Sequence, residues 1–554
     1  MRSLSGIQFF LTCWLVLFLG ASAWSLAVPL FASYDESAQV VHAVGVVNGQ
    51  LVGRPVENPG QQFSRVDMVR VPAYYGTADG TAQCFSLRLD VSAGCSAGFQ
   101  VTDSTVIEVA TWVGRYPVAY YAVVGLPGLV LDGAPAVYAM RLVSAALVSG
   151  MLAIGMTALR STRFPRAALA AGLVAITPTT MFMAGVVNPS GLEIAAGFAT
   201  WALFLPLALD PGRHNVPARL FAGTAVGAVL VNTRPASGVM AVLIGGVLVL
   251  LAGRLFWQQA RGRWVGASAA LAVVAGGGAL AWITLMDPTS TLVGAPAPQL
   301  ENPLRAASAA AMQSRYYLQQ QIATFWDTPG PLVSVVIWAF LVGCLVLAAW
   351  ALADRRSRLV ILLIALATVV VPIVGQVPGA GEVGLIWQGR YLLPFTIGVP
   401  LVAVGLVLRE RTGRTLVQKL IPVVVVLTAV GQLAAVGWVL WRFGYGLAAT
   451  PIVDDAGWAP PGGFLLPVVL AVVATSGLAV LVLGAPRGTP ARTAGVGDAE
   501  REPLAFVTGD GDRRAAPPAT GSTRADTSRW LVSTPPVPSR PLSTDSDGVH
   551  RPAD

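Results

Sequence analysis

Charged residues are what this sequence has least of. They make up 12% of its 554 residues, against about 25% in an average soluble globular protein. So little charge cannot cover a water-exposed surface of this size, which excludes an ordinary soluble fold. Lysine is almost absent, with Lys419 alone, so the net charge of +8 comes from arginine. The arginines lie between hydrophobic runs, and we therefore expect no nucleic-acid partner.

Histidine and cysteine are also scarce, with three histidines and four cysteines. No Cys/His cluster has the spacing of a zinc site. We therefore expect neither a metal ion nor a cofactor.

Long uncharged runs are what the sequence does contain, for example 7–30, 359–373 and 420–440. A bilayer core needs about 20 apolar residues as helix, and only helices or closed barrels pair all their backbone groups in lipid. The runs are much longer than the roughly 10-residue strands of a membrane barrel. The prediction is an all-α integral membrane protein of about 12 transmembrane helices, within a range of about 10 to 13. The predicted spans lie near 7–31, 135–158, 167–187, 191–209, 219–233, 235–253, 264–285, 331–353, 359–378, 391–408, 417–441 and 463–485.

Arginine placement predicts the orientation of these spans, because cytoplasmic loops are enriched in Lys and Arg. With the N-terminus inside, the alternate inner loops hold most of the basic residues, and both termini are predicted to be cytoplasmic. The inner-loop basic residues are Arg160, Arg163, Arg166, Arg213, Arg219, Arg254, Arg261, Arg263, Arg355, Arg356, Arg358, Arg409, Arg411, Arg414 and Lys419. Region 219–253 has the alternative of a re-entrant hairpin. The first run has a possible cleavage site at Ala21-Ser22-Ala23, but its hydrophobicity continues to Leu30, which favours an uncleaved helix.

Two large extracytoplasmic loops interrupt the predicted membrane domain of residues 1–485. In the first, about 32–134, Tyr116–Leu131 is predicted to be an interfacial or partly re-entrant helix. In the second, about 286–330, Leu304–Trp326 is predicted to be an interfacial amphipathic helix. Residues 486–554 are rich in Pro, Ser, Thr, Arg and Asp, which predicts a disordered cytoplasmic tail.

The four cysteines divide between the first loop and the predicted spans. Cys84 and Cys95 share the first loop, where an oxidising setting favours a disulfide between them. Cys13 and Cys344 fall in predicted helices, where we expect them to pack.

The segment after the first span carries the first candidate site residues. Asp35 and Glu36 would place two adjacent carboxylates at the outer membrane surface, with Gln39 and His42 close behind. Such carboxylates suit a general base. The alternative is a helix start, in which Ser33 and Glu36 form a capping box.

Three further groups lie at predicted outer ends of spans. Ser190 and Glu193, in the turn that begins at Asn188, fit a second capping box. Arg234 and Arg141 lie at membrane depth, where a charge faces a partner or a cavity or else snorkels to headgroups.

The segment Trp387–Pro394 opens the tenth predicted span. Arg390, between Gln388 and Tyr391, is suited to bind a lipid phosphate. The aromatic neighbours alone would be explained by an interfacial belt.

Taken together, these segments resemble an uncharacterised bacterial family of multi-spanning membrane proteins, a domain of unknown function numbered twenty-one forty-two, whose members resemble GT-C membrane glycosyltransferases. The residues that carry the resemblance are Asp35-Glu36, Arg115-Tyr116-Pro117 with Tyr120-Tyr121, Ala139-Met140-Arg141, Asn188-Pro189, Thr324-Phe325-Trp326, and Gln388-Gly389-Arg390-Tyr391 with Pro394. The sequence departs from the family at two places. Gln39 stands where the family has histidine, and Ser190 stands where an acid is common.

The resemblance implies a GT-C-like fold in a bacterial plasma membrane. It also implies an inverting transfer of a sugar from a polyprenyl-phosphate donor to an envelope glycan or glycoprotein at the outer face. Asp35 would deprotonate the acceptor, Glu36 would orient Asp35 or bind the sugar, and Arg390, then Arg234, would stabilise the leaving phosphate. Gln39, His42, Asn188, Glu193, Gln388 and Tyr391 would contact substrate.

Two other functions stay open from the sequence. Twelve spans with Pro/Gly-interrupted helices suit a transporter or lipid flippase, although clear paired repeats, which carriers usually show, are not evident. Gln39 can bind a sugar hydroxyl but cannot shuttle a proton, which favours a non-catalytic envelope-assembly protein.

Overall fold

The computed structural model describes residues 4–57, 65–291, 295–449 and 455–488. These residues belong to one compact unit, Met1–Pro490. Apart from residues 486–488, the predicted tail therefore lies outside the described residues.

Hydrophobic helices dominate the described part of the chain, eight of which are long and apolar enough to cross a membrane. They are α1 (Gly6–Ala27), α4 (Gly133–Arg160), α7 (Pro189–Leu209), α11 (Arg263–Met286), α14 (Leu332–Leu352), α15 (Arg355–Gln376), α19 (Arg411–Gly444) and α20 (Leu465–Leu483). A bent pair, α5 (Pro165–Ala175) and α6 (Pro178–Ala184), makes a ninth if it is one span. The chain is thus a multi-pass helical membrane protein.

Three shorter apolar segments fall where the remaining spans are predicted. They are α8 (Val216–Val231), α9 (Ser237–Leu251) and the stretch Leu393–Val407, which contains α17 (Leu393–Thr396) and α18 (Val399–Val407). Every predicted span therefore contains helix, but these three are short for a bilayer core about 30 Å thick. A count of twelve spans stays a prediction.

The bend between α5 and α6 has a local cause. Thr177 caps α6 by accepting a hydrogen bond from the Thr180 backbone N–H, and Pro178 has no N–H with which to continue α5. The two helix axes differ by 73°. Gln432 of α19 donates its Nε2 to the carbonyl of Ile176 at 2.9 Å, so a backbone group freed by the bend is paired inside the bundle, as lipid requires.

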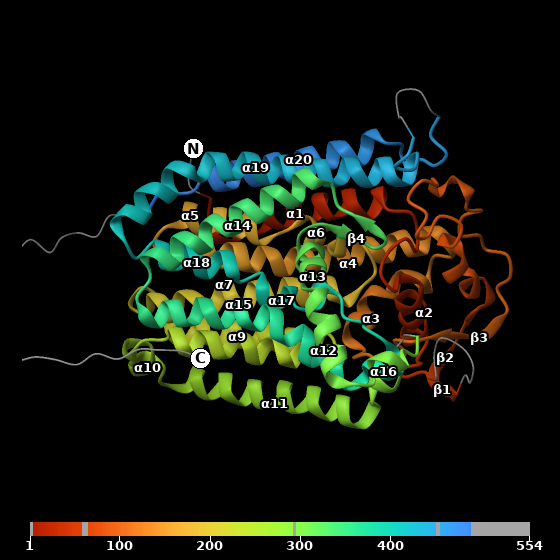
Figure 1. Ribbon diagram of the computed structural model, residues 1–554, viewed down its shortest axis with the longest axis horizontal. Helices are drawn as coiled ribbons and strands as arrows, with labels where there is room; N and C mark the ends of the chain where they lie inside the picture. The colour runs from red at the N-terminus through yellow and green to blue at the C-terminus, as the bar shows by residue number, and fades with distance from the viewer. Residues whose placement is uncertain (1–3, 58–64, 292–294, 450–454, 489–554) are drawn as a thin grey trace, which may run out of the picture. The chain divides into compact units, whose positions relative to one another are not determined.

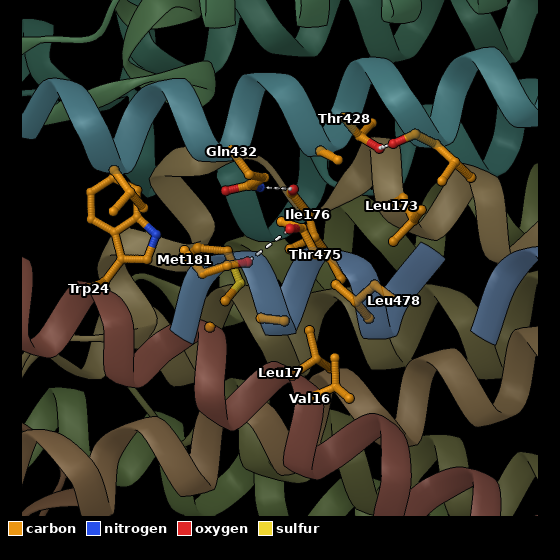
Figure 2. Close-up of a pocket in the computed structure, with 16 residues that line it drawn as sticks. Val16, Leu17, Trp24, Leu173, Ile176, Met181, Thr428, Gln432, Thr475 and Leu478 are labelled. Atoms are coloured by element: carbon orange, nitrogen blue, oxygen red, sulfur yellow. Dashed lines mark hydrogen bonds between the residues drawn. The ribbon is translucent and has the colours of Figure 1, made fainter. Parts of the chain in front are cut away.

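Figure 2 shows this hydrogen bond at the edge of a narrow apolar pocket between α1, α5, α6, α19 and α20. Thr475 lines the pocket and donates its hydroxyl to a carbonyl of its own helix. The polar groups in the pocket are thus paired, and its lining does not include Asp35 or Arg390.

The helices run along a common direction in Figure 1, with α4 packed between α1 and α7, and α20 against the other side of α1. The large loops gather at one end, and α10 (Arg254–Gln259) lies at the other. We call the end with the large loops the Asp35 end.

The first large loop contains short helices, as predicted, and a small sheet that was not predicted. It contains α2 (Glu36–Val47), α3 (Ala119–Val124) and an antiparallel sheet, ordered β1-β2-β3, of β1 (Arg54–Glu57), β2 (Arg65–Pro72) and β3 (Val106–Thr111). Short 3₁₀ turns cover Ala73–Thr77, Asp79–Ala82, Ala93–Cys95 and Leu126–Leu129. The prediction for Tyr116–Leu131 is right in kind, because α3 and the last turn are short helices there.

The central strand β2 explains how the sheet is held. Asp67, Val69 and Val71 alternate along it and are all buried, as expected for the covered face of a strand. Asp67 pairs with Arg115 at 3.0 Å, and Arg115 donates to the carbonyl of Met286 at the end of α11. The sheet is thereby fastened to a membrane-spanning helix.

The second large loop forms two helices and a hairpin. They are α12 (Pro303–Met312), α13 (Ser314–Ile322) and the pair β4 (Thr324–Phe325) and β5 (Thr328–Pro329). The prediction of one helix over Leu304–Trp326 is therefore wrong. The chain breaks at Gln313 and becomes extended from Ala323. A four-residue helix, α16 (Ala380–Val383), also lies at this end.

A disulfide between Cys84 and Cys95 closes a small loop at the Asp35 end. Arg442, at the end of α19, is fully buried and donates to the carbonyls of Phe85 and Val91 within that loop, at 2.8 and 2.7 Å. The guanidinium thus binds the loop through main-chain atoms, which any sequence in the loop would offer.

Asp327 completes this contact from the β4–β5 turn. Its carboxylate pairs with Arg442 at 3.2 Å and accepts the backbone N–H of Leu87 at 2.8 Å. The first loop, the second loop and α19 therefore meet at one buried ion pair.

Candidate functional site

Asp35 lies at the start of α2, where the chain turns after α1. Its backbone is left-handed, with φ of 56°, a conformation that costs a non-glycine residue some energy and is enriched at functional sites. Trp112 donates its indole N–H to Asp35 Oδ1 at 3.2 Å, and Arg390 donates to Oδ2 at 2.9 Å. The Asp35 side chain is 34% exposed, whereas that of Arg390 is 2% exposed.

Arg390 is held by side chains from three segments. Besides Asp35, it donates to Gln388 Oε1 at 2.6 Å and to Ser190 Oγ at 3.0 Å. Its guanidinium carbon lies 4.4 Å from the ring centre of Tyr34 and 5.0 Å from that of Tyr391, close enough for cation–π attraction. The cation is therefore fixed in position before any ligand binds.

Close backbone packing holds Arg390 in this buried position. Gly389 precedes it, and a Cβ there would lie 2.1 Å from the carbonyl of Tyr317 in α13. The Gly389 N–H donates to Gln320 Oε1 at 2.5 Å. Only glycine permits this approach, so α13 of the second loop sets the position of the arginine.

The turn before α7 presents Ser190 to this cluster. Asn188 caps α7 by accepting the Ser190 N–H at 2.9 Å, and its amide donates to the carbonyl of Tyr34 at 2.7 Å. The predicted capping box of Ser190 and Glu193 is therefore wrong, because Asn188 takes the capping position and Glu193 has other partners.

Glu193 and Arg234 form a second ion pair, at 3.1 Å, which Ser237 supports by donating to Glu193 Oε1 at 2.7 Å. The Arg234 guanidinium lies 4.7 Å from the ring centre of Tyr391. Arg234 is 9% exposed, so it is paired inside the protein and does not snorkel to headgroups. Tyr391 is within cation–π distance of both Arg234 and Arg390, and the structure thus brings these two predicted residues together.

Glu36 lies apart from Asp35 although the two are adjacent in sequence. Its carboxylate and the Arg141 guanidinium are both fully buried, joined by two hydrogen bonds. The Glu36 oxygens also accept the backbone N–H groups of Phe31 and Val187, each at 3.0 Å. The predicted capping box of Ser33 and Glu36 is therefore wrong, because Asp35 is the N-cap residue of α2.

Arg141 extends this pair to the end of α1. It donates to the carbonyls of Ser25, Val28 and Pro29 at 2.7–2.9 Å; Ser25 is in the last turn of α1, where the helix leaves carbonyls without an intrahelical partner. Arg141 is fully buried, so it too does not snorkel. The Glu36–Arg141 pair joins α1, α2, α4 and the turn before α7. It thereby holds the backbone next to Asp35 in place.

Gln39 and His42 are buried in α2, on the side of α3. Tyr121 donates its hydroxyl to Gln39 Oε1 at 2.5 Å, and its ring lies 4.3 Å from that of His42. With exposed fractions of 2% and 0%, these two side chains present little surface to a substrate.

Burial lowers the pKa of His42 from 6.5 to about 4. An unfolded chain binds this proton below about pH 6.5, whereas the folded chain does so only below about pH 4, so stability falls as the pH drops between these values. The expected loss is about 3 kcal/mol, from about 1.4 kcal/mol for each pKa unit. His42→Phe should flatten the change in unfolding temperature between pH 7.5 and pH 4.5. If the unfolding temperature of His42→Phe falls between pH 7.5 and pH 4.5 as much as that of the unmodified protein, His42 is not the cause of the pH dependence.

The charges of the site balance in pairs. Asp35, Glu36 and Glu193 neutralise Arg390, Arg141 and Arg234, and of these three carboxylates only Asp35 is appreciably exposed. Burial raises the pKa of the Tyr34 phenol beneath Arg390, so this tyrosine is neutral. Across the described part of the chain, no three His, Cys, Asp or Glu side chains gather as metal ligands would.

Sequence reasoning missed Trp112 and Tyr34, which contact Asp35 and Arg390 directly. Trp112 follows a short strand in a loop, where nothing local distinguishes it, and Tyr34 was passed over beside its acidic neighbours. Asn188, Gln388 and Tyr391 do lie in the cluster, each within contact distance of another member.

Comparison with known families covers this whole cluster. Residues 17–399 match the model of a family described as "Predicted membrane protein (DUF2142)". The match includes Asp35, Arg234 and Arg390 but ends before α19. No curated protein matched the chain.

Proposed function

We propose that this chain, which belongs to the DUF2142 family of predicted membrane proteins, transfers a sugar from a polyprenyl-phosphate donor to an acceptor of the cell envelope. The observation that carries the proposal is the pair of a partly exposed carboxylate, Asp35, with a buried arginine, Arg390, at one end of the helical bundle. A base and a phosphate-binding cation are the two groups that such a transfer needs.

Asp35 acts as the general base in this proposal. It removes the proton of the acceptor hydroxyl, whose oxygen attacks the anomeric carbon as the bond to the donor phosphate breaks, with inversion at that carbon. An ionised carboxylate has about four acceptor positions, and the N–H groups of Trp112 and Arg390 use two of them. The Asp35 carboxylate can therefore still accept a hydrogen bond from the hydroxyl group of the acceptor.

Arg390 stabilises the charge of the leaving lipid phosphate through its positive charge rather than by direct contact, because only 2% of its side chain is exposed. A guanidinium has five N–H donors, and Arg390 gives three of them to Asp35, Gln388 and Ser190. Arg234, which is paired with Glu193, also lies against the ring of Tyr391. Preorganised donors of this kind lower the energy of developing charge without needing to reorient during the reaction.

Glu36 serves as a positioning residue here rather than a catalytic one, because it has no exposed surface. Gln39 stands where the family has histidine and cannot transfer a proton. Its side chain instead accepts a hydrogen bond from Tyr121, which is a structural contact. The proposed chemistry accordingly needs Asp35 and not residue 39.

The experiment compares envelope glycans of a deletion strain with those of its parent by mass spectrometry, and then tests the purified protein with labelled polyprenyl-phosphate sugars. Loss of one glycan species in the strain, and transfer of label in vitro, are the expected results. Binding of lipid-linked sugar without turnover would instead identify an envelope-assembly protein. A cysteine-labelling map that put Asp35 in the cytoplasm would overturn the outer-face reaction.

A transporter or lipid flippase is the second candidate, favoured by the broken pair α5–α6. Discontinuous helices of this kind form substrate sites in carriers. Uptake of substrate into proteoliposomes without a covalent product would favour it over the transferase.

A further inference from the structure

A second pocket lies far along the bundle from the Asp35 end, between α7, α8, α9 and α11. It encloses about 500 Å³ and has a mostly apolar lining that includes Phe204, Leu230, Ile244 and Val249. The two threonines that line it, Thr200 and Thr224, donate their hydroxyls to carbonyls of their own helices. The described lining therefore offers an apolar chain a surface without unmet polar groups.

Small residues keep this pocket open. Gly227, Gly245 and Gly276 line it, and a Cβ added at any of them would meet no atom within 4 Å. α11 packs against α8 along this side of the bundle. The space is thus a groove bounded by four helices rather than a packing defect around one side chain.

The length of the pocket matches one leaflet of a bilayer. Its lining runs along α11 from Val265 to Gly276, a separation of 11 residues, or about 16 Å at 1.5 Å per residue. A bilayer core is about 30 Å thick, so the groove spans about half of it. This is the reach of one acyl chain.

The mouth of the pocket is basic and aromatic. Phe256 and Trp257 of α10 line the pocket, and Arg254, Arg261 and Arg263 are exposed beside them. No acid occurs between residues 253 and 264. Exposed tryptophans and arginines at the end of a spanning helix are typical of the membrane interface, and arginine is well suited to bind phosphate.

Acids of neighbouring segments do not cancel this charge. Asp354 shares an adjoining pocket with Arg254, Arg356 and Arg409, and it caps α15 by accepting the N–H of Ser357. Asp210 follows α7 nearby. The arginines outnumber these two acids.

From these observations we propose that the pocket binds an anionic phospholipid, with one acyl chain between α8, α9 and α11 and the phosphate at Arg254, Arg261 and Arg263. The inference does not depend on the sugar-transfer proposal. Lipid tails gain little by leaving other lipid tails for an apolar protein surface. Selectivity must therefore come from the headgroup, at about fivefold in affinity for each arginine near the membrane surface.

The test uses the full-length protein in nanodiscs with equal phosphatidylglycerol and phosphatidylcholine, followed by native mass spectrometry of the lipids that stay bound. Gly245→Leu fills the pocket. Gly246→Leu is its matched control, because Gly246 is on the same helix, has equal open space and does not line the pocket. Leucine has a higher helix propensity than glycine, so we expect neither substitution to destabilise α9.

The expected result is retention of phosphatidylglycerol by the unmodified protein and by Gly246→Leu, and its loss in Gly245→Leu. The double variant Arg261→Gln with Arg263→Gln should lower the preference for phosphatidylglycerol by at least about tenfold. Equal retention in Gly245→Leu and Gly246→Leu would overturn the proposal. So would equal binding of both lipids, or displacement of phosphatidylglycerol by stoichiometric polyprenyl phosphate.

Discussion

Asp35→Asn is expected to lower the rate of sugar transfer by about 10²- to 10⁴-fold, the usual contribution of a general base. The amide keeps the shape of the carboxylate and can still accept the N–H of Trp112, but it cannot take the acceptor proton. It also leaves Arg390 without its counter-ion. The measurement is the initial rate of label transfer from a polyprenyl-phosphate sugar, at equal amounts of folded protein.

Asp79→Asn is the matched control for this substitution. Asp79 is exposed at the same end of the bundle and accepts a hydrogen bond from Ser37 in α2 at 3.1 Å, which an asparagine can also accept. Transfer by Asp79→Asn should match that of the unmodified protein. If Asp35→Asn also transfers at the full rate, Asp35 is not the base, and the function built on it fails.

Glu36→Ala is expected to lower the free energy of unfolding by about 3–5 kcal/mol, the cost of leaving one member of a buried ion pair without its partner. Arg141 would keep its three carbonyl acceptors but lose the charge that neutralises it. The N–H groups of Phe31 and Val187 would lose their acceptor as well. The measurement is thermal unfolding of the purified protein in one detergent.

A double variant separates loss of charge balance from loss of packing. Glu36→Leu with Arg141→Met removes both charges and keeps the volume, and should recover much of the stability. Glu108→Ala is the exposed control, because its pair with Arg54 lies in solvent and pairs of that kind contribute little. A double variant as unstable as Glu36→Ala would show that the backbone groups bound by these two side chains, rather than the charges, set the cost.

The helices were predictable because their signal is local. A run such as that of α1 needs only its own length and apolar composition to be recognised. The sheet was not predictable in the same way. β2 places Asp67 on its buried face, and this carboxylate is tolerated there only through Arg115, 48 residues further on. In the sequence alone, the charges of Arg65, Asp67 and Arg70 suggest a solvated loop.

The candidate site was likewise predictable only where the signal is local. The sequence placed Asp35 and Arg390 at one predicted face but gave no sign that they touch, because 355 residues separate them. Both capping boxes had the right spacing and failed because Glu36 and Glu193 are held by arginines 105 and 41 residues away. Local patterns identified these acids, and distant partners determined what they do.

The distance along the chain between Asp35 and Arg390 also sets when the cluster can first exist. A ribosome adding about 5–20 residues per second needs about 20–70 s to cover the 355 residues between them. Arg442 reaches the carbonyl of Val91 after a similar wait of 351 residues. Until residue 390 has been made, the first loop is present without either arginine, and Arg442 joins it only with the end of α19. A chain truncated before residue 390 would therefore contain Asp35 without the arginine that pairs with it.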